Sequence, residues 1–117
     1  MVTFVADRES DVFEFFREAH QCGIDVLVRA AYDRNLEGEE ARVFAALASA
    51  PVITQKYLAL AGTPQRKART AKLEIRACPL ILQAPRNGTA QGLPPLPLWG
   101  LWAHETEPPP GEEPLDW

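Results

Sequence analysis

Two short apolar runs flank an amphipathic segment within the first thirty residues. The runs cover residues 2–6 and 25–30, and both are rich in β-branched side chains. Between them, apolar side chains recur at helical spacing, namely Val12, Phe15, Phe16 and Ala19. This order predicts a strand, a helix and a second strand. Such a βαβ unit has parallel strands and a right-handed crossover.

The local signals around this unit add detail. The apolar centre of residues 25–30 predicts burial on both faces, and residues 2–6 are likewise predicted to be a buried strand. Gly23 is expected to end the helix in the left-handed conformation, and Ser10 or Asp11 is expected to cap its start. Two strands and one helix cannot make a stable sheet alone. Exposed strand edges therefore predict self-association by strand pairing or swapping.

The pattern changes after Arg34. Residues 39–48 predict one short helix that Pro51 stops. From there on the apolar residues alternate, which predicts mainly antiparallel strands at residue 53 and at 56–60, 72–81 and 96–103. Loops are expected at 62–69 and 85–95, with Asn87-Gly88 as a tight turn, and residues 112–117 are expected to return toward a core.

Composition limits the class of protein. The chain has 117 residues, is 46% hydrophobic and carries a net charge of −4, so any basic surface must be local. Cys22 and Cys78 lie in unrelated contexts without zinc-type spacing. Two free thiols fit a reducing compartment, and a single disulfide between them stays open as the alternative. Neither a signal peptide nor a transmembrane segment is evident, so a soluble, cytoplasmic protein with no membrane partner is expected.

An acidic run follows the first apolar run. Asp7 stands at the tip of the predicted strand, and Glu9 and Asp11 follow within four residues. A carboxylate at the C-terminal end of a strand is a common ligand for a divalent metal. The same acids can also serve only to cap a helix, whose N-terminus attracts negative charge. Both interpretations stay open at this point.

A family resemblance favours the metal. Residues 5–11, the helix after them and residues 26–30 resemble the catalytic core of bacterial insertion-sequence transposases. These belong to the ribonuclease H-like DDE superfamily, in a subgroup with a β-rich insertion. The basic run 66–76 and the segment 103–117 are similar to the middle and the return of that insertion. The resemblance implies an α/β fold, with a partial ribonuclease H-like βαβ core (1–34), a mainly antiparallel β insertion (35–114) and the start of the returning strand (115–117).

The resemblance also assigns roles. Asp7 matches the second acid of the catalytic triad, which implies a ligand of Mg²⁺ or Mn²⁺. Arg29 matches an arginine close to the DNA at the active site; it could equally be an arginine paired with a neighbouring acid. Trp117 matches a tryptophan that stacks where a base is flipped out. Phosphate contacts are expected from a basic group, namely Arg66, Lys67 and Arg69.

The implied activity is cut-and-paste transposition of double-stranded transposon ends in a bacterial cytoplasm. The first aspartate would lie upstream of Met1, and the glutamate, in a Tyr-x-x-Arg-x-x-x-Glu helix, would lie downstream of Trp117. With one acid of three, the chain is expected to be a fragment that is inactive alone. The alternative is a non-catalytic, β-rich interaction module, in which the acids cap a helix and tryptophans form a partner surface. By their pattern alone, Trp99 and Trp102 are expected in the core.

Overall fold

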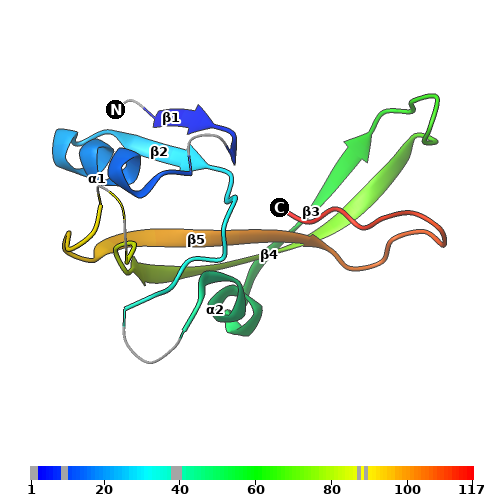
Figure 1. The fold of residues 1–117 in the computed structure, drawn as a ribbon. Helices are drawn as coiled ribbons and strands as arrows, with labels where there is room; N and C mark the ends of the chain where they lie inside the picture. Colours follow the sequence, from blue (N-terminus) through cyan, green and yellow to red (C-terminus); the bar gives the residue numbers. More distant parts are fainter. Residues whose placement is uncertain (1–2, 9–10, 38–40, 87, 89) are drawn as a thin grey trace. The chain divides into compact units, whose positions relative to one another are not determined.

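The computed structural model describes residues 3–8, 11–37, 41–86, 88 and 90–117. Over these residues the chain is mixed α/β, with two helices, a parallel pair of strands and a mainly antiparallel three-stranded sheet (Figure 1). The elements are β1 (Thr3–Ala6), α1 (Phe13–Cys22), β2 (Asp25–Val28), α2 (Val43–Ser49), β3 (Val52–Leu60), β4 (Arg69–Leu82) and β5 (Leu96–Glu105). Neither helix has the length and apolar character needed to span a membrane.

Contacts group the chain into two compact units. The first comprises residues 1–44 and 80–98, and the second comprises residues 45–79 and 99–117. Strands β4 and β5 contribute residues to both units. The division into 1–34, 35–114 and 115–117 rests on the family resemblance and stays a prediction.

The predicted βαβ pattern is present in the first unit. Strands β1 and β2 pair in parallel, with Ala6 opposite Val28. Helix α1 connects them, and it ends as predicted at Gly23, whose φ of 70° lies in the left-handed region. Its last turn is closed by the Ile24 N–H, which donates to the carbonyl of Ala19 at 2.9 Å. Local sequence signals therefore sufficed for this part of the fold.

Burial of these strands was predicted wrongly. Along β2, Val26 and Val28 are half-buried, whereas Leu27 is 51% exposed. On β1, Val5 is 69% exposed. The reason is that α1 packs against β2 and the described sheet has only two strands, so one face lacks a covering layer. An apolar run indicates a strand but does not show how many layers cover it.

The start of α1 also differs from the prediction. Its N-cap is Val12, which offers no side-chain hydrogen bond. Asp11 does not cap the helix, because its carboxylate is used by the segment after β2. Ser10, the other predicted cap, lies outside the described residues. The helix is held instead by its apolar face, on which Phe13, Phe16 and Ala19 are buried.

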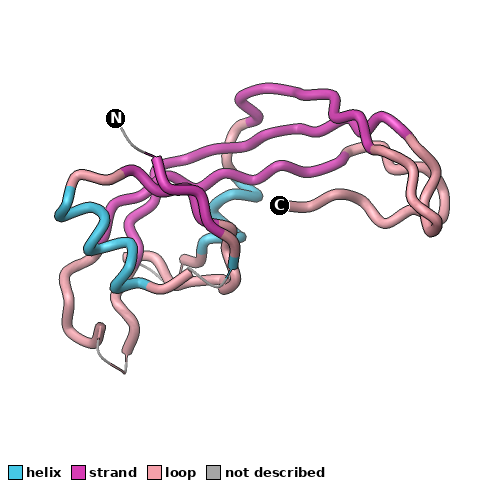
Figure 2. Tube along the Cα trace, turned by 90° about the horizontal axis from the view of Figure 1, so that it is seen from above, coloured by secondary structure: helices cyan, strands magenta, loops and turns pink. Residues whose placement is uncertain are grey.

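The predicted antiparallel strands are present but longer. β3 is continuous from Val52 and pairs antiparallel with β4, with a register shift between Val52 and Thr54. Figures 1 and 2 show these strands side by side with β5. Trp99 on β5 is 71% exposed, so its predicted place in the core was wrong, and Trp102 is half-buried. A three-stranded sheet has two faces, and alternation alone does not reveal which of them is covered.

Candidate active site and nucleic-acid interface

The first candidate site lies at one edge of the parallel pair. Asp7 directly follows β1, and Arg29 directly follows β2. Because Ala6 is opposite Val28, both residues leave the sheet at the same end. The Arg29 N–H donates to the Ala6 carbonyl at 3.2 Å, which holds the two chain segments together there. The fold thus brings together two residues that are 22 positions apart and that sequence reasoning had assigned to one site.

The Asp7 carboxylate is exposed and suits a hard metal ion. One oxygen accepts the Arg8 N–H at 2.8 Å, and the residue is exposed to solvent. Among the described residues, no group of three or more His, Cys, Asp or Glu side chains is placed to hold a metal. Glu9 lies outside those residues. A single carboxylate fits one position of a divalent-metal site, and further oxygen ligands would be needed to complete it.

Asp11 anchors the loop that follows Arg29. Its side chain is 3% exposed, and one oxygen accepts the N–H groups of Ala31 and Tyr32 at 2.7 and 3.1 Å. The other oxygen accepts Arg34 Nε at 2.9 Å, and Arg34 Nη2 donates to the Asp11 carbonyl at 2.8 Å. Four hydrogen bonds therefore tie the start of α1 to the chain leaving β2. They fix the backbone on both sides of the edge that carries Asp7 and Arg29.

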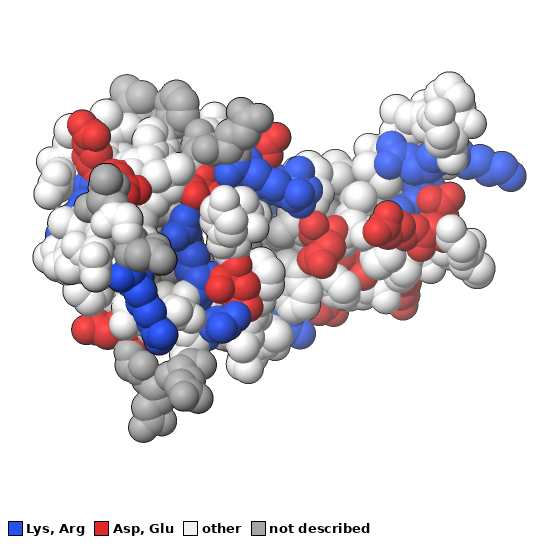
Figure 3. All heavy atoms as spheres, viewed as in Figure 1, with Lys and Arg blue, Asp and Glu red and all other residues white. Residues whose placement is uncertain are grey.

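The basic hairpin is the second candidate site. We use this name for residues 63–69, which follow β3 and include the first residue of β4; Arg66, Lys67 and Arg69 belong to it. It lines a groove of about 760 Å³ together with Pro109, Pro110 and Glu112 of the C-terminal segment. In Figure 3, Lys and Arg side chains gather where this hairpin lies, and acidic side chains lie next to them. The local positive charge is therefore partly compensated.

Of the three basic residues, Arg69 is the one whose charge is paired with a carboxylate. Its Nη1 and Nη2 atoms both donate to the Glu105 carboxylate, the second at 3.0 Å, and its side chain is 12% exposed. The same carboxylate accepts the Leu115 N–H at 3.0 Å. The hydrogen bonds from Arg69 lower the pKa of Glu105, burial raises it, and the hydrogen bond from Leu115 lowers it further. The net result is a pKa below the usual range of a glutamate. Neither Arg66 nor Lys67 forms an ion pair among the described residues, so both are better placed than Arg69 to contact a phosphate. Lys67 is exposed, whereas Arg66 is half-buried and its Nη2 atom donates to the Ala61 carbonyl at 3.1 Å.

Trp117 lies on the C-terminal segment of the second unit. Its N–H donates to the Ala103 carbonyl at 2.9 Å, and the Ala103 N–H donates to the Trp117 carbonyl at 2.7 Å. The backbone is thus paired to β5, while the residue as a whole is 68% exposed. Sequence reasoning expected this segment to return to a core, and the Leu115 side chain is half-buried. Trp117 itself remains largely exposed.

No protein-family model matches the chain, and no curated protein sequence matches it. Sequence reasoning missed the roles of Asp11 and Glu105 in the two candidate sites. The residues that bond to Asp11 lie 20, 21 and 23 positions away, and those that bond to Glu105 lie 36 and 10 positions away. Their sequence contexts gave no signal beyond an acid beside an apolar run.

Proposed function

We propose that this chain is part of the catalytic domain of a cut-and-paste DNA transposase of the ribonuclease H-like DDE superfamily. The observation that carries the proposal is the shared edge of β1 and β2, where Asp7 and Arg29 leave the sheet together. An acid and an arginine side by side suit a metal ion and a phosphodiester, respectively. Open α/β sheets bind their ligands at the carboxyl ends of the strands.

Each candidate residue has a separate role in this proposal. Asp7 would hold one divalent ion, and Arg29 would place positive charge near the scissile phosphate. Mg²⁺ or Mn²⁺, when bound, supplies Lewis-acid activation of a water or 3′ hydroxyl and stabilises the leaving oxygen. Arg66 and Lys67 would contact the DNA backbone, and Trp117 would stack on a flipped base. With Asp7 as the one catalytic acid it contributes, the chain is expected not to cleave DNA by itself.

Duplex binding tests the proposal. With two or three phosphate contacts, from Arg29, Arg66 and Lys67, log K should fall with log salt at a slope of roughly −2 to −3. Between about 50 and about 200 mM KCl the affinity should then drop roughly 10- to 40-fold. Fluorescence anisotropy with a labelled duplex of about 20 base pairs measures this change. The double substitution Arg66→Gln and Lys67→Gln should reduce the slope by about 2.

Lys56→Gln is the matched control, because it removes one exposed positive charge from β3, outside the basic hairpin. The slope should stay as it is in the unmodified chain. Binding that does not respond to salt, or a slope that the double substitution leaves unchanged, would contradict the assignment of the hairpin to phosphate contacts.

A non-catalytic interaction module is the second candidate. It is favoured by β3, which lies at the edge of the three-stranded sheet and exposes Ile53 at 56%, Tyr57 at 71% and Leu58 at 40%. Exposed apolar edge strands pair with other chains. We therefore infer that copies of the chain associate along β3, so that light scattering should detect a species larger than 13.0 kDa. A monodisperse monomer would contradict this association. This candidate predicts no salt-dependent duplex binding.

A further inference from the structure

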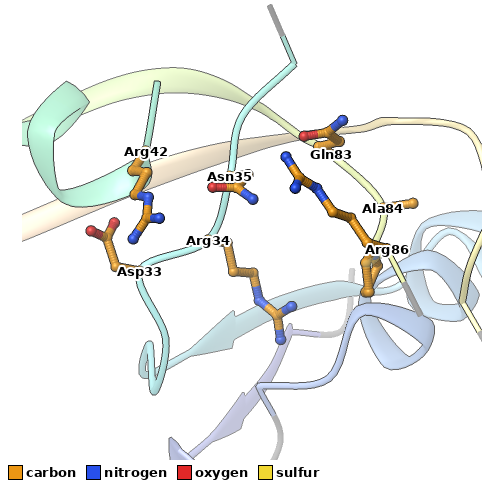
Figure 4. A pocket seen from close by; sticks show the side chains of 8 residues that line it. Asp33, Arg34, Asn35, Arg42, Gln83, Ala84 and Arg86 are labelled. Carbon is orange, nitrogen blue, oxygen red and sulfur yellow. The ribbon is translucent and has the colours of Figure 1, made fainter. Parts of the chain in front are cut away.

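The first unit contains a small pocket that none of the assignments above uses. It has a volume of about 220 Å³, and its polar lining residues are Asp33, Arg34, Asn35, Arg42, Gln83 and Arg86. Figure 4 shows these side chains arriving from three separate stretches of chain. The volume is below the range typical of drug-sized ligands, so the pocket suits a small group.

Backbone hydrogen bonds fix the frame of this pocket. Asn35 forms an antiparallel bridge with Arg42, and its carbonyl accepts the Gln83 N–H at 3.0 Å. The Val43 N–H donates to the Arg34 carbonyl at 3.0 Å. The three stretches are thus clamped against one another. The pocket does not depend on side-chain packing alone for its shape.

Three arginines and one aspartate line the pocket, so its charge is positive. The Arg34 guanidinium is paired with Asp11, and one oxygen of Asp33 accepts the Phe44 N–H at 2.9 Å. Figure 4 shows the Asp33 carboxylate and the Arg42 guanidinium pointing toward one another, so Asp33 offsets part of this charge. Arg42 and Arg86 are both exposed, and neither forms an ion pair or side-chain hydrogen bond with another described residue. In Figure 4 the Arg86 side chain extends toward Asn35. Two guanidinium groups therefore border the pocket beside two side-chain amides, which are also hydrogen-bond donors.

We propose that this pocket binds a phosphate group. Guanidinium forks match the geometry of phosphate oxygens, and charge-assisted hydrogen bonds are the strong ones. Arg42 and Arg86 would bind the anion from two sides, and the Asn35 and Gln83 amides would donate to its remaining oxygens. The phosphate can belong to a DNA backbone or to a free phosphate or phosphate ester. The inference does not depend on Asp7, on the basic hairpin or on the transposase proposal.

Titration of the whole 117-residue chain with inorganic phosphate tests the site, at constant ionic strength and with ¹⁵N-resolved NMR. Saturable shifts are expected at the amides of Asn35, Arg42, Gln83 and Arg86. Arg42→Gln and Arg86→Gln should each weaken the affinity about tenfold or more, because each removes charge-assisted bonds. Lys56→Gln removes the same charge outside the pocket and should leave the affinity unchanged. The amide spectrum of each variant shows at the same time whether it is folded.

A second titration with a short duplex separates the two sources of phosphate. If the duplex shifts the same amides and inorganic phosphate displaces it, the pocket is assigned to the DNA backbone. Shifts with inorganic phosphate alone would assign it to a free phosphate or a phosphate ester. The proposal is overturned if phosphate gives no saturable shift at these amides, or if both arginine substitutions leave the affinity unchanged.

Discussion

Replacing Asp11 with alanine is expected to destabilise the chain by about 3–5 kcal/mol, the usual result of breaking a buried charged pair. The substitution leaves the N–H groups of Ala31 and Tyr32 without their acceptor and the Arg34 guanidinium without its carboxylate. Native domains are stable by only about 5–15 kcal/mol, so the loss would be a large part of the total. Urea unfolding followed by circular dichroism measures it.

Two further variants make this result specific. Asp11→Asn keeps the shape and one acceptor oxygen, so its loss should be smaller, about 1–3 kcal/mol. Asp25→Ala removes an exposed carboxylate of the same unit and should change the free energy of unfolding by less than about 0.5 kcal/mol. An Asp11→Ala variant as stable as the Asp25→Ala control would show that the four hydrogen bonds do not hold the first unit together.

Glu105→Gln is expected to have the second large effect. It removes the charge that pairs with Arg69 and weakens the acceptor of the Leu115 N–H. At neutral pH the unfolding equilibrium constant should rise about tenfold or more, because the half-buried Arg69 guanidinium loses the carboxylate that pairs with it. Hydrogen exchange at the Leu115 and Trp117 amides should become faster, since the C-terminal segment loses one of its attachments to β5.

The stabilisation by the Glu105–Arg69 ion pair should depend on pH in a definite direction. The pKa of Glu105 is lower in the folded chain than its ordinary value, chiefly because Arg69 donates to the ionised form. Ionised Glu105 therefore stabilises the folded chain fully above the ordinary glutamate pKa of about 4.3. This stabilisation is lost as the pH falls through the lower pKa that Glu105 has in the folded chain. The difference between the unmodified chain and Glu105→Gln should narrow over that acidic window.

Glu113→Gln is the matched control, since it removes an exposed carboxylate from the same C-terminal segment. Its stability and its pH dependence should follow those of the unmodified chain. If the difference for Glu105→Gln were constant from neutral to acidic pH, the ion pair with Arg69 would not be the source of the effect.

Local patterns in the sequence predicted the elements well. The helix from Phe13 to its left-handed end at Gly23 was recognised from apolar spacing and one glycine. The antiparallel pairing of β3 and β4 followed from alternation. These features depend on residues close in sequence, where propensity and periodicity act directly. The proximity of Asp7 and Arg29 also followed, because parallel strands of a βαβ unit end at one edge.

Burial and long-range partners could not be predicted in the same way. Leu27 and Trp99 were expected to be buried, yet both are exposed. A continuous apolar run does not show how many layers cover a strand, and alternation does not show which face of a sheet is covered. Asp11 was expected to cap the helix that follows it, whereas its partners lie beyond β2. The proposed phosphate pocket forms because backbone hydrogen bonds hold three separate stretches of chain together. Patterns within a single sequence do not reveal such long-range hydrogen bonds.

The most direct test of the transposase proposal is the nucleotide sequence on either side of the region that encodes this chain, translated in all frames. The proposal predicts an upstream strand that ends in an aspartate and a downstream helix with Tyr-x-x-Arg-x-x-x-Glu, either continuous with the chain or interrupted. These would supply the two acids that complete a site with Asp7. Flanking sequence that encodes neither element would contradict membership of the family.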